Sequence, residues 1–184
     1  MDPELVTQLL DWIRSRHFGK YRGQVTSNQD ATKRGRLKVT VPAVLGTLEV
    51  WAMPCVPYAG DQVGFFAMPP EQTGVWIEFE GGDPSFAIWT GCFWADDEAP
   101  LGGEPDMKVW KTDGLTLSLD DSATEATLKN DSASVTMNDS VATVVSSGKH
   151  TVTSSGVTTE AGGKGKVEVT SAMVDLNSGG MQVS

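Results

Sequence analysis

The chain has 184 residues, with 14 Lys and Arg against 24 Asp and Glu and a formal net charge of −10 at pH 7. A length of this order suits one domain or two. The acidic balance argues against sequence-independent binding of nucleic acid and against docking on anionic lipid, because both use an excess of Lys and Arg. No apolar run approaches the roughly 18 residues that span a bilayer, and the N-terminus does not have the pattern of a signal peptide. We therefore expect a protein that is made and kept in a cytoplasm, or that leaves it without a cleaved signal.

Residues 1–17 are expected to form a separate N-terminal segment that contains a short helix. Asp2 can cap the N-terminus of a helix, Pro3 suits the first helical position, and Glu4 is an acidic residue in the first turn. Leu5, Leu9 and the pair Trp12/Ile13 then recur at helical spacing, which predicts an amphipathic helix over residues 3–16. A helix of this length is marginal alone. We expect its apolar stripe to dock on the following domain, and docking on a partner is the alternative.

Residues 18–94 are expected to form a compact aromatic module. The stretch from Trp51 to Trp94 holds four of the six Trp, five of the six Phe and both Cys. Alternation of apolar and polar residues predicts short strands at 21–26, 36–42, 51–57, 75–80 and 87–93. Five short antiparallel strands with Gly at the bends favour a small closed barrel over a sandwich.

The residue types in this module also predict its interior. We expect Trp76, Phe79 and Trp89 to be core side chains rather than ligand platforms. Cys55 and Cys92 lie in apolar sequence contexts, so we expect both to be reduced and buried.

The composition changes after the barrel. Residues 95–110 are acidic and contain Pro and Gly, which is typical of a linker. Residues 111–184 contain no Phe, Tyr, Trp, Pro or Cys. In their place, pairs of apolar residues separated by one polar residue recur every nine and later about every seven residues: Leu117/Leu119, Ala126/Leu128, Val135/Met137, then Val144, and later Val167/Val169, Val174/Leu176 and Met181/Val183.

Such periodicity predicts a stack of short strands joined by tight polar turns. One chain of this kind buries too little apolar area to offset its conformational entropy. Either the segment is disordered, as its Ser, Thr and Gly content allows, or identical copies wind together so that their apolar side chains meet. The regular alternation favours the second interpretation, a trimeric intertwined β-helix (β-prism) over residues 111–184.

No constellation of residues indicates catalysis. His17 and His150 are the only histidines and lie in different modules. The GGKGK run ending at Lys166 lacks the Gly that a P-loop has several residues before its GK pair. Glu78 and Glu80 lie on the same face of one predicted strand, which is typical of carboxylates exposed to water. Asn130 and Asn138 fit the glycosylation pattern, which carries little weight without a secretory signal. We expect no enzyme, and no catalytic, cofactor-binding or metal-binding residue.

An ordered set of motifs nevertheless resembles a known family. The motifs are Tyr21-Arg22-Gly23, Arg34-Gly35-Arg36-Leu37-Lys38-Val39, Trp51-Ala52-Met53-Pro54-Cys55, Val75-Trp76-Ile77-Glu78-Phe79-Glu80, Gly81-Gly82-Asp83-Pro84 and Ile88-Trp89-Thr90-Gly91. Together they resemble the OB-fold domain of the central spike of phage baseplates (baseplate assembly protein V) and its VgrG relatives in type VI secretion. The resemblance covers residues 18–94.

The resemblance implies a fold and a function. It implies an all-β chain with a five-stranded OB-fold barrel, followed by a triple-stranded β-helix in which three chains form a needle. Such a needle lies on the axis of a contractile injection machine, punctures a target envelope mechanically and commonly carries a PAAR-type tip. Expected partners are two further copies of the chain, a hub protein at the N-terminal and OB-fold end, and a tip protein at the C-terminal end, without nucleic acid. The alternative is an OB-fold module that binds oligonucleotide or oligosaccharide and carries a flexible tail.

Two departures narrow these expectations. Residues 95–110 leave no room for the lysozyme domain that follows the barrel in some spikes, so peptidoglycan hydrolysis is not implied. Only about 17 residues precede the barrel, whereas VgrG proteins carry a fused hub there. We therefore expect a separate hub chain and a place in the baseplate of a phage tail, a tailocin or an extracellular contractile injection system.

Overall fold

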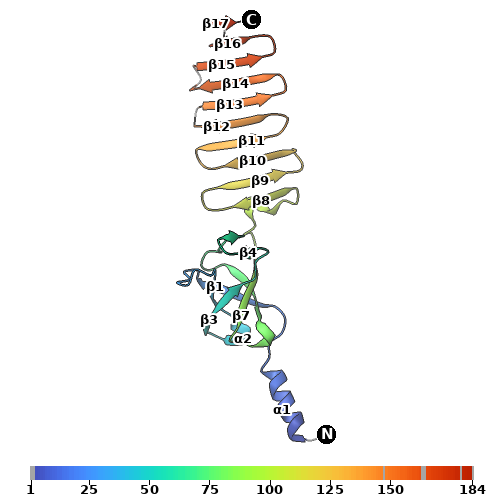
Figure 1. The fold of residues 1–184 in the computed structure, drawn as a ribbon. Helices are drawn as coiled ribbons and strands as arrows, with labels where there is room; N and C mark the ends of the chain where they lie inside the picture. Colours follow the sequence, from blue (N-terminus) through green and yellow to red (C-terminus); the bar gives the residue numbers. More distant parts are fainter. Residues whose placement is uncertain (1–2, 147, 163–164, 179, 184) are drawn as a thin grey trace. The chain divides into compact units, whose positions relative to one another are not determined.

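The computed structural model describes residues 3–146, 148–162, 165–178 and 180–183, and it divides into two compact units, Met1–Glu98 and Ala99–Ser184. Apart from the helix α1 (Pro3–Arg14) and short helical turns, the described elements are strands (Figure 1). This confirms the all-β prediction. Among the described residues, no helix is both long and apolar enough to cross a membrane.

The first unit contains a closed five-stranded barrel, as predicted. Its strands pair around the ring in the order β1-β2-β3-β7-β6. Their bounds are Tyr21–Ser27 for β1, Leu37–Thr40 for β2, Glu49–Pro54 for β3, Gly74–Phe79 for β6 and Ala87–Phe93 for β7. All pairs are antiparallel except β3 with β7, which is parallel. The expectation of a wholly antiparallel barrel was wrong in this detail, because a ring of five strands with alternating directions must leave one parallel pair.

The barrel core follows the alternation of its strands. The side chains of Leu37 and Ile77 are fully buried, and Phe79 and Trp89 are 6% exposed, which confirms two of the three predicted core aromatics. Trp76 lies outside the core, because Val75 and Ile77 take the inward positions of the same strand. Its ring packs instead against Phe93, at 5.0 Å between centroids, and under the Arg22 guanidinium.

Both cysteines lie on the surface. Cys55 and Cys92 are free and exposed, so the prediction that they are buried was wrong. Cys55 follows directly after the end of β3, and Cys92 is the second-last residue of β7, where it pairs with Val75. An apolar sequence context at a strand end therefore did not indicate burial.

The predicted amphipathic helix is present, but its apolar stripe is uncovered. The side chains of Leu5, Leu9 and Trp12 are each more than half exposed. The described core of the barrel contains no side chain of α1, so the expectation that the helix docks on its own domain was wrong. The junction that follows α1 is held by the backbone N–H of His17, which donates to the carbonyl of Gly82 at 2.8 Å.

Short elements complete the first unit. They are α2 (Pro42–Leu45), the hairpin of β4 (Ala59–Gly60) with β5 (Val63–Gly64), and the 3-10 turn η1 (Glu80–Gly82). The β4–β5 hairpin lies between the predicted strands 51–57 and 75–80, where no strand was predicted.

Gly23 gives a direct test of barrel packing. Gly23 lies inside β1, where it is buried. A Cβ at this position would lie 2.8 Å from the Thr40 carbonyl oxygen and 2.9 Å from the Ile77 side chain. We expect Gly23→Ala to destabilise the barrel by about 1–3 kcal/mol through overpacking. Thermal unfolding measures this, with Gly114→Ala as the control because a Cβ there meets nothing within 4 Å. Equal melting temperatures of the two variants would contradict the expectation.

The second unit is one antiparallel sheet of consecutive strands, in the order β17 to β8 (Figure 1). The bounds are Met107–Lys111 (β8), Thr116–Asp120 (β9), Glu125–Lys129 (β10), Ala133–Met137 (β11), Val141–Val145 (β12), Gly148–Thr153 (β13), Gly156–Ala161 (β14), Gly165–Thr170 (β15), Val174–Leu176 (β16) and Met181–Val183 (β17). The predicted stack of short strands is therefore confirmed. The turn η2 (Pro100–Gly103) and strand β8 lie within or begin within the segment expected to be a linker.

Polar side chains at the ends of strands organise the turns of this sheet. The Oδ1 atoms of Asp120 and Asn130 each accept hydrogen bonds from backbone N–H groups two and three residues ahead. Thr153 and Thr170 do the same with Oγ1. Asn138 accepts from the N–H of Ser140. Such side-chain hydrogen bonds stabilise these turns without Pro, and they give Asn130 and Asn138 a structural role.

Candidate functional surface

One face of the C-terminal sheet gathers its apolar side chains. Residues that pair across antiparallel strands point to the same side of the sheet. The register produces two columns of paired residues on that side. The first is Trp110, Leu117, Leu128, Val135, Thr143, His150, Thr159, Val167, Leu176 and Met181; the second is Lys108, Leu119, Ala126, Met137, Val141, Val152, Val157, Val169 and Val174. We call the side that carries both columns the apolar face.

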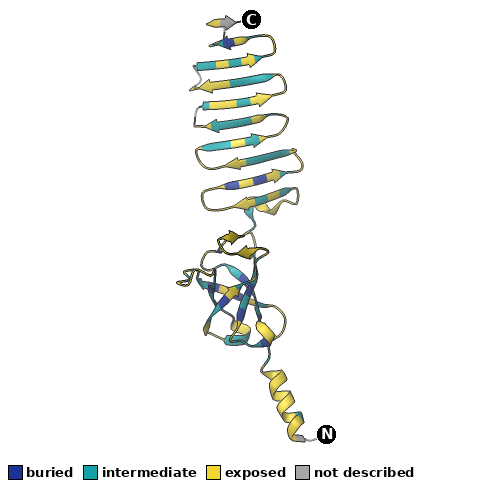
Figure 2. Cartoon of the chain, in the orientation of Figure 1, coloured by how far each residue is buried: buried dark blue, intermediate teal, exposed yellow. Residues whose placement is uncertain are grey.

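The apolar face is uncovered in the single chain. Leu128 is 42% exposed, Met137 is 55% exposed and Val167 is 41% exposed. The buried residues among those described in the sheet are Thr116, Ser118 and Asp175, which all lie on the opposite face. Figure 2 shows intermediate and exposed residues over most of these strands. A contiguous exposed apolar surface of this kind marks an interaction site.

The opposite face of the sheet is polar and internally paired. Lys166 and Glu168 form an ion pair at 2.7 Å, and the hydrogen bond to Glu168 raises the pKa of Lys166. The hydroxyl groups of Thr127 and Thr136 bond across neighbouring strands at 3.3 Å. Val144 also lies on this side, although the nine-residue spacing from Val135 predicted that it continues the apolar series. The sheet thus has one face suited to water and one suited to burial.

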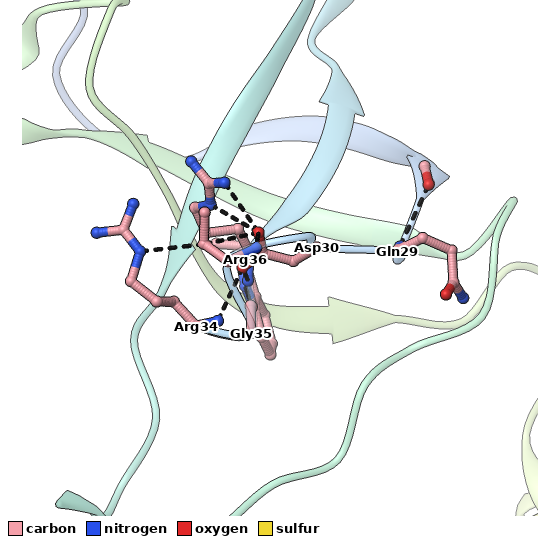
Figure 3. A network of polar contacts seen from close by, with 8 residues as sticks. Gln29, Asp30, Arg34, Gly35 and Arg36 are labelled. Atoms are coloured by element: carbon pink, nitrogen blue, oxygen red, sulfur yellow. Dashed lines mark hydrogen bonds and ion pairs between the residues drawn. The ribbon is translucent and has the colours of Figure 1, made fainter. Parts of the chain in front are cut away.

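In the barrel, Asp30 organises the loop between β1 and β2 (Figure 3). Its carboxylate side chain is 4% exposed and accepts hydrogen bonds from Arg36, at 2.8 Å from Nη2 and 3.2 Å from Nε. It also accepts from the backbone N–H groups of Thr32, Arg34 and Arg36. The hydrogen bond from Arg36 is the largest cause that lowers the pKa of Asp30 far below its usual range.

The same loop is tied into the barrel core. The indole Nε1–H of Trp89 donates to the carbonyl of Gly35 at 3.1 Å, and the Arg36 guanidinium lies 5.0 Å from the centre of the Trp51 ring. The network therefore fixes the Arg34-Gly35-Arg36 motif within the barrel.

A cleft lies beside this loop and is bounded by the β4–β5 hairpin. It has a volume of about 630 Å³ and is lined mainly by apolar and aromatic side chains, among them Tyr58, Phe65, Phe66 and Trp89. Lys33, Arg34 and Asp61 supply its charged groups. The described residues that line it include no His or Cys.

The residues considered for chemistry from the sequence do not come together. His17 packs against Tyr21 and Phe79 in the barrel unit, and His150 lies in β13 of the other unit. Glu78 is ion-paired with Lys20. Part of the GGKGK run, residues 163–164, lies outside the described residues. In the described parts of one chain, no three His, Cys, Asp or Glu side chains are grouped to hold a metal ion.

Sequence reasoning missed the role of Asp30. A signal was available, because Asp30 is the one acidic residue between Asp11 and Glu49, in a segment that contains several Lys and Arg. Such a lone acid close to several cations is a good candidate for a shared hydrogen-bond acceptor.

No curated protein matches the chain. Residues 21–94, the segment that forms the barrel, match the family model described as the type VI secretion system/phage-baseplate injector OB domain. The barrel segment is therefore similar to the OB domain of these injectors, and the match supports a structural role related to a baseplate spike.

Proposed function

We propose that the chain is the central spike of a contractile injection machine, in the baseplate of a phage or a phage-tail-like particle. Three copies associate through their apolar faces and form a needle from the C-terminal sheets. The barrel end joins a separate hub protein, and the free end of the needle carries a PAAR-type tip. The needle punctures the target envelope mechanically when the machine contracts, without an enzymatic step.

The observation that carries this proposal is the apolar face. Burying a Val or Leu side chain contributes about 1.5–3 kcal/mol, and both columns of the face expose such residues along most of the sheet. Three copies that turn these faces inward and their polar faces outward would bury the columns and remain soluble. The number three is supported by the resemblance of the barrel segment to spikes that are trimeric.

The mechanical role is supported by the composition of the sheet. Its consecutive strands pair with their neighbours along the whole described meander, and several of the described turns are closed by side-chain hydrogen bonds. A dry interior behind such a sheet resists deformation, because close-packed interiors have low compressibility. The uncovered stripe of α1 (Leu5, Leu9, Trp12 and Ile13) provides an apolar surface for the hub.

The mass of the purified full chain tests the proposal. Light scattering is expected to give about 59 kDa, which is three chains of 19.6 kDa. A stable monomer of 19.6 kDa, or a dimer, would contradict it. Mixing the chain with the candidate hub protein then tests the contact with the hub. Removal of residues 1–14 is expected to weaken hub binding, while light scattering still gives the mass of a trimer of the shortened chain.

A second candidate function is supported by the cleft beside the β4–β5 hairpin. Aromatic residues with Lys33 and Arg34 are the kind of surface on which OB-folds hold single-stranded nucleic acid. The net charge of −10 opposes this function. Retention of single-stranded DNA at moderate salt would favour it, and loss of retention in Arg34→Ala would locate the site.

A further inference from the structure

The apolar face is interrupted at one place. In the first column, three successive strands contribute Thr143, His150 and Thr159, whereas the neighbouring positions along the column are Val135 and Val167. The second column continues as Val141, Val152 and Val157 across the same three strands β12, β13 and β14. These three residues, which we call the polar row, therefore interrupt the first column beside an unbroken run of Val in the second, and they include the one histidine of the C-terminal unit.

The row also orients the imidazole. His150 lies near the middle of β13, and its Nδ1 is 2.9 Å from the Thr159 hydroxyl oxygen. When Nδ1–H donates to this oxygen, Nε2 keeps its lone pair and is the free ligand atom. Histidines that bind metals commonly have this arrangement, in which one ring nitrogen is held by a neighbouring acceptor and the other coordinates the metal.

We propose that His150 from three copies of the chain forms a binding site for a divalent first-row transition metal inside the needle. The proposal rests on the trimer proposed above, because one described chain has no group of three ligands. Equivalent residues of three chains lie at the same level around a threefold axis, so three imidazoles converge there. Three histidines with a water in the fourth position are an established ligand set for Zn²⁺, and imidazole also suits Ni²⁺, Cu²⁺ and Fe²⁺.

The surroundings favour binding over simple hydration. Thr143 and Thr159 flank His150 in its column, Val135 and Val167 lie beyond them, and Val152 stands beside His150 in the second column, so an ion bound there would have apolar residues around its polar neighbours. A polar group buried without a partner is costly. A metal ion satisfies three imidazole nitrogens at once, and it would bind the three sheets to one another in the middle of their length.

Metal analysis of the purified full chain tests the proposal. The protein is stripped with EDTA, incubated with Zn²⁺ or Ni²⁺, and freed of unbound metal. We expect one ion per three chains and a higher melting temperature of the C-terminal unit with metal than without. His150→Gln is expected to remove both effects. His17→Gln is the matched control, since it removes the other histidine and is expected to retain them.

Thr159→Val provides a second variant, in case His150→Gln does not assemble. It removes the acceptor that orients the imidazole but keeps the ligand and the apolar character of the face. We expect metal affinity to fall by about 10–100-fold while the mass of the trimer is unchanged. A structural role of Thr159 alone would alter stability without altering metal affinity.

The outcomes separate this inference from the proposed function. If the trimer binds no metal, or if His150→Gln binds metal as well as the natural chain does, the proposed metal site is wrong and the proposed spike function still stands. A monomer would overturn both.

Discussion

Replacing Leu128 with Asp is expected to convert the trimer into monomers. Leu128 lies in β10 on the apolar face, between Leu117 and Val135 in the first column. In the trimer, the substitution would place three carboxylates in a dry interior close to one another. A buried charge without a partner costs several kcal/mol, so three of them exceed what the neighbouring apolar contacts can offset. Light scattering is expected to shift from about 59 kDa to 19.6 kDa.

Lys129→Asp is the matched control for this experiment. Lys129 is the next residue of the same strand, it is exposed, and it points to the opposite face. Its replacement changes the charge by two units, whereas Leu128→Asp changes it by one. If assembly depended on overall charge, the control would be the more damaging variant. A trimeric Leu128→Asp protein, or equal dissociation of both variants, would show that the apolar face does not hold the copies together.

The sheet could be predicted from the sequence to the extent that its repeat is regular. The pairs Leu117/Leu119, Ala126/Leu128 and Val135/Met137 keep a constant spacing, and the structure places all of them on one face. The prediction failed at Val144, because the turn between β11 and β12 brings Val135 opposite Thr143 rather than Val144. A shift of one residue moves a side chain to the other face of a strand. Spacing alone could not show this shift, since it depends on the length of the turn at Asn138.

The same shift concealed the polar row. Once the spacing loosened, Thr143, His150 and Thr159 no longer stood at recognisable repeat positions. His150 therefore suggested an isolated histidine, and only the strand register shows that it shares a column with Leu128 and Val167. The register across several strands is set by turn geometry and strand pairing, and it cannot be derived from the residue types at individual positions.

In the barrel, strand positions and most of the core followed from alternation, but long-range contacts did not. The segment around Asp30 lies between two predicted strands, and alternation did not indicate that Arg36 and three backbone N–H groups converge on one carboxylate. For the same reason, the sequence predicted the apolar stripe of α1, which the structure shows exposed, but not what covers it. Amphipathicity identifies a surface and leaves its partner open.

Replacing Asp30 with Asn is expected to lower the melting temperature of the barrel by several degrees at neutral pH. The amide keeps one oxygen for backbone N–H groups but loses the charge that holds the Arg36 guanidinium. Trp fluorescence reports on this unit, since five of the six Trp precede Glu98. Asp61→Asn is the control, because Asp61 is an exposed carboxylate of the same barrel unit.

The dependence on pH gives the sharper test of this network. The pKa of Asp30 is lowered in the folded chain, first by the hydrogen bond from Arg36. In the unfolded chain it is about 3.9, so below that pH the unfolded state binds the proton more readily. The contribution of Asp30 to stability is thus fully present well above pH 4 and is lost as the pH falls further. Glu49 and Asp83, whose pKa values are also lowered, act in the same direction. Between about pH 4 and pH 2, we therefore expect the Asp30→Asn variant to lose stability less steeply than the natural chain. If plots of stability against pH run parallel for the two proteins, the Asp30–Arg36 contact does not stabilise the fold.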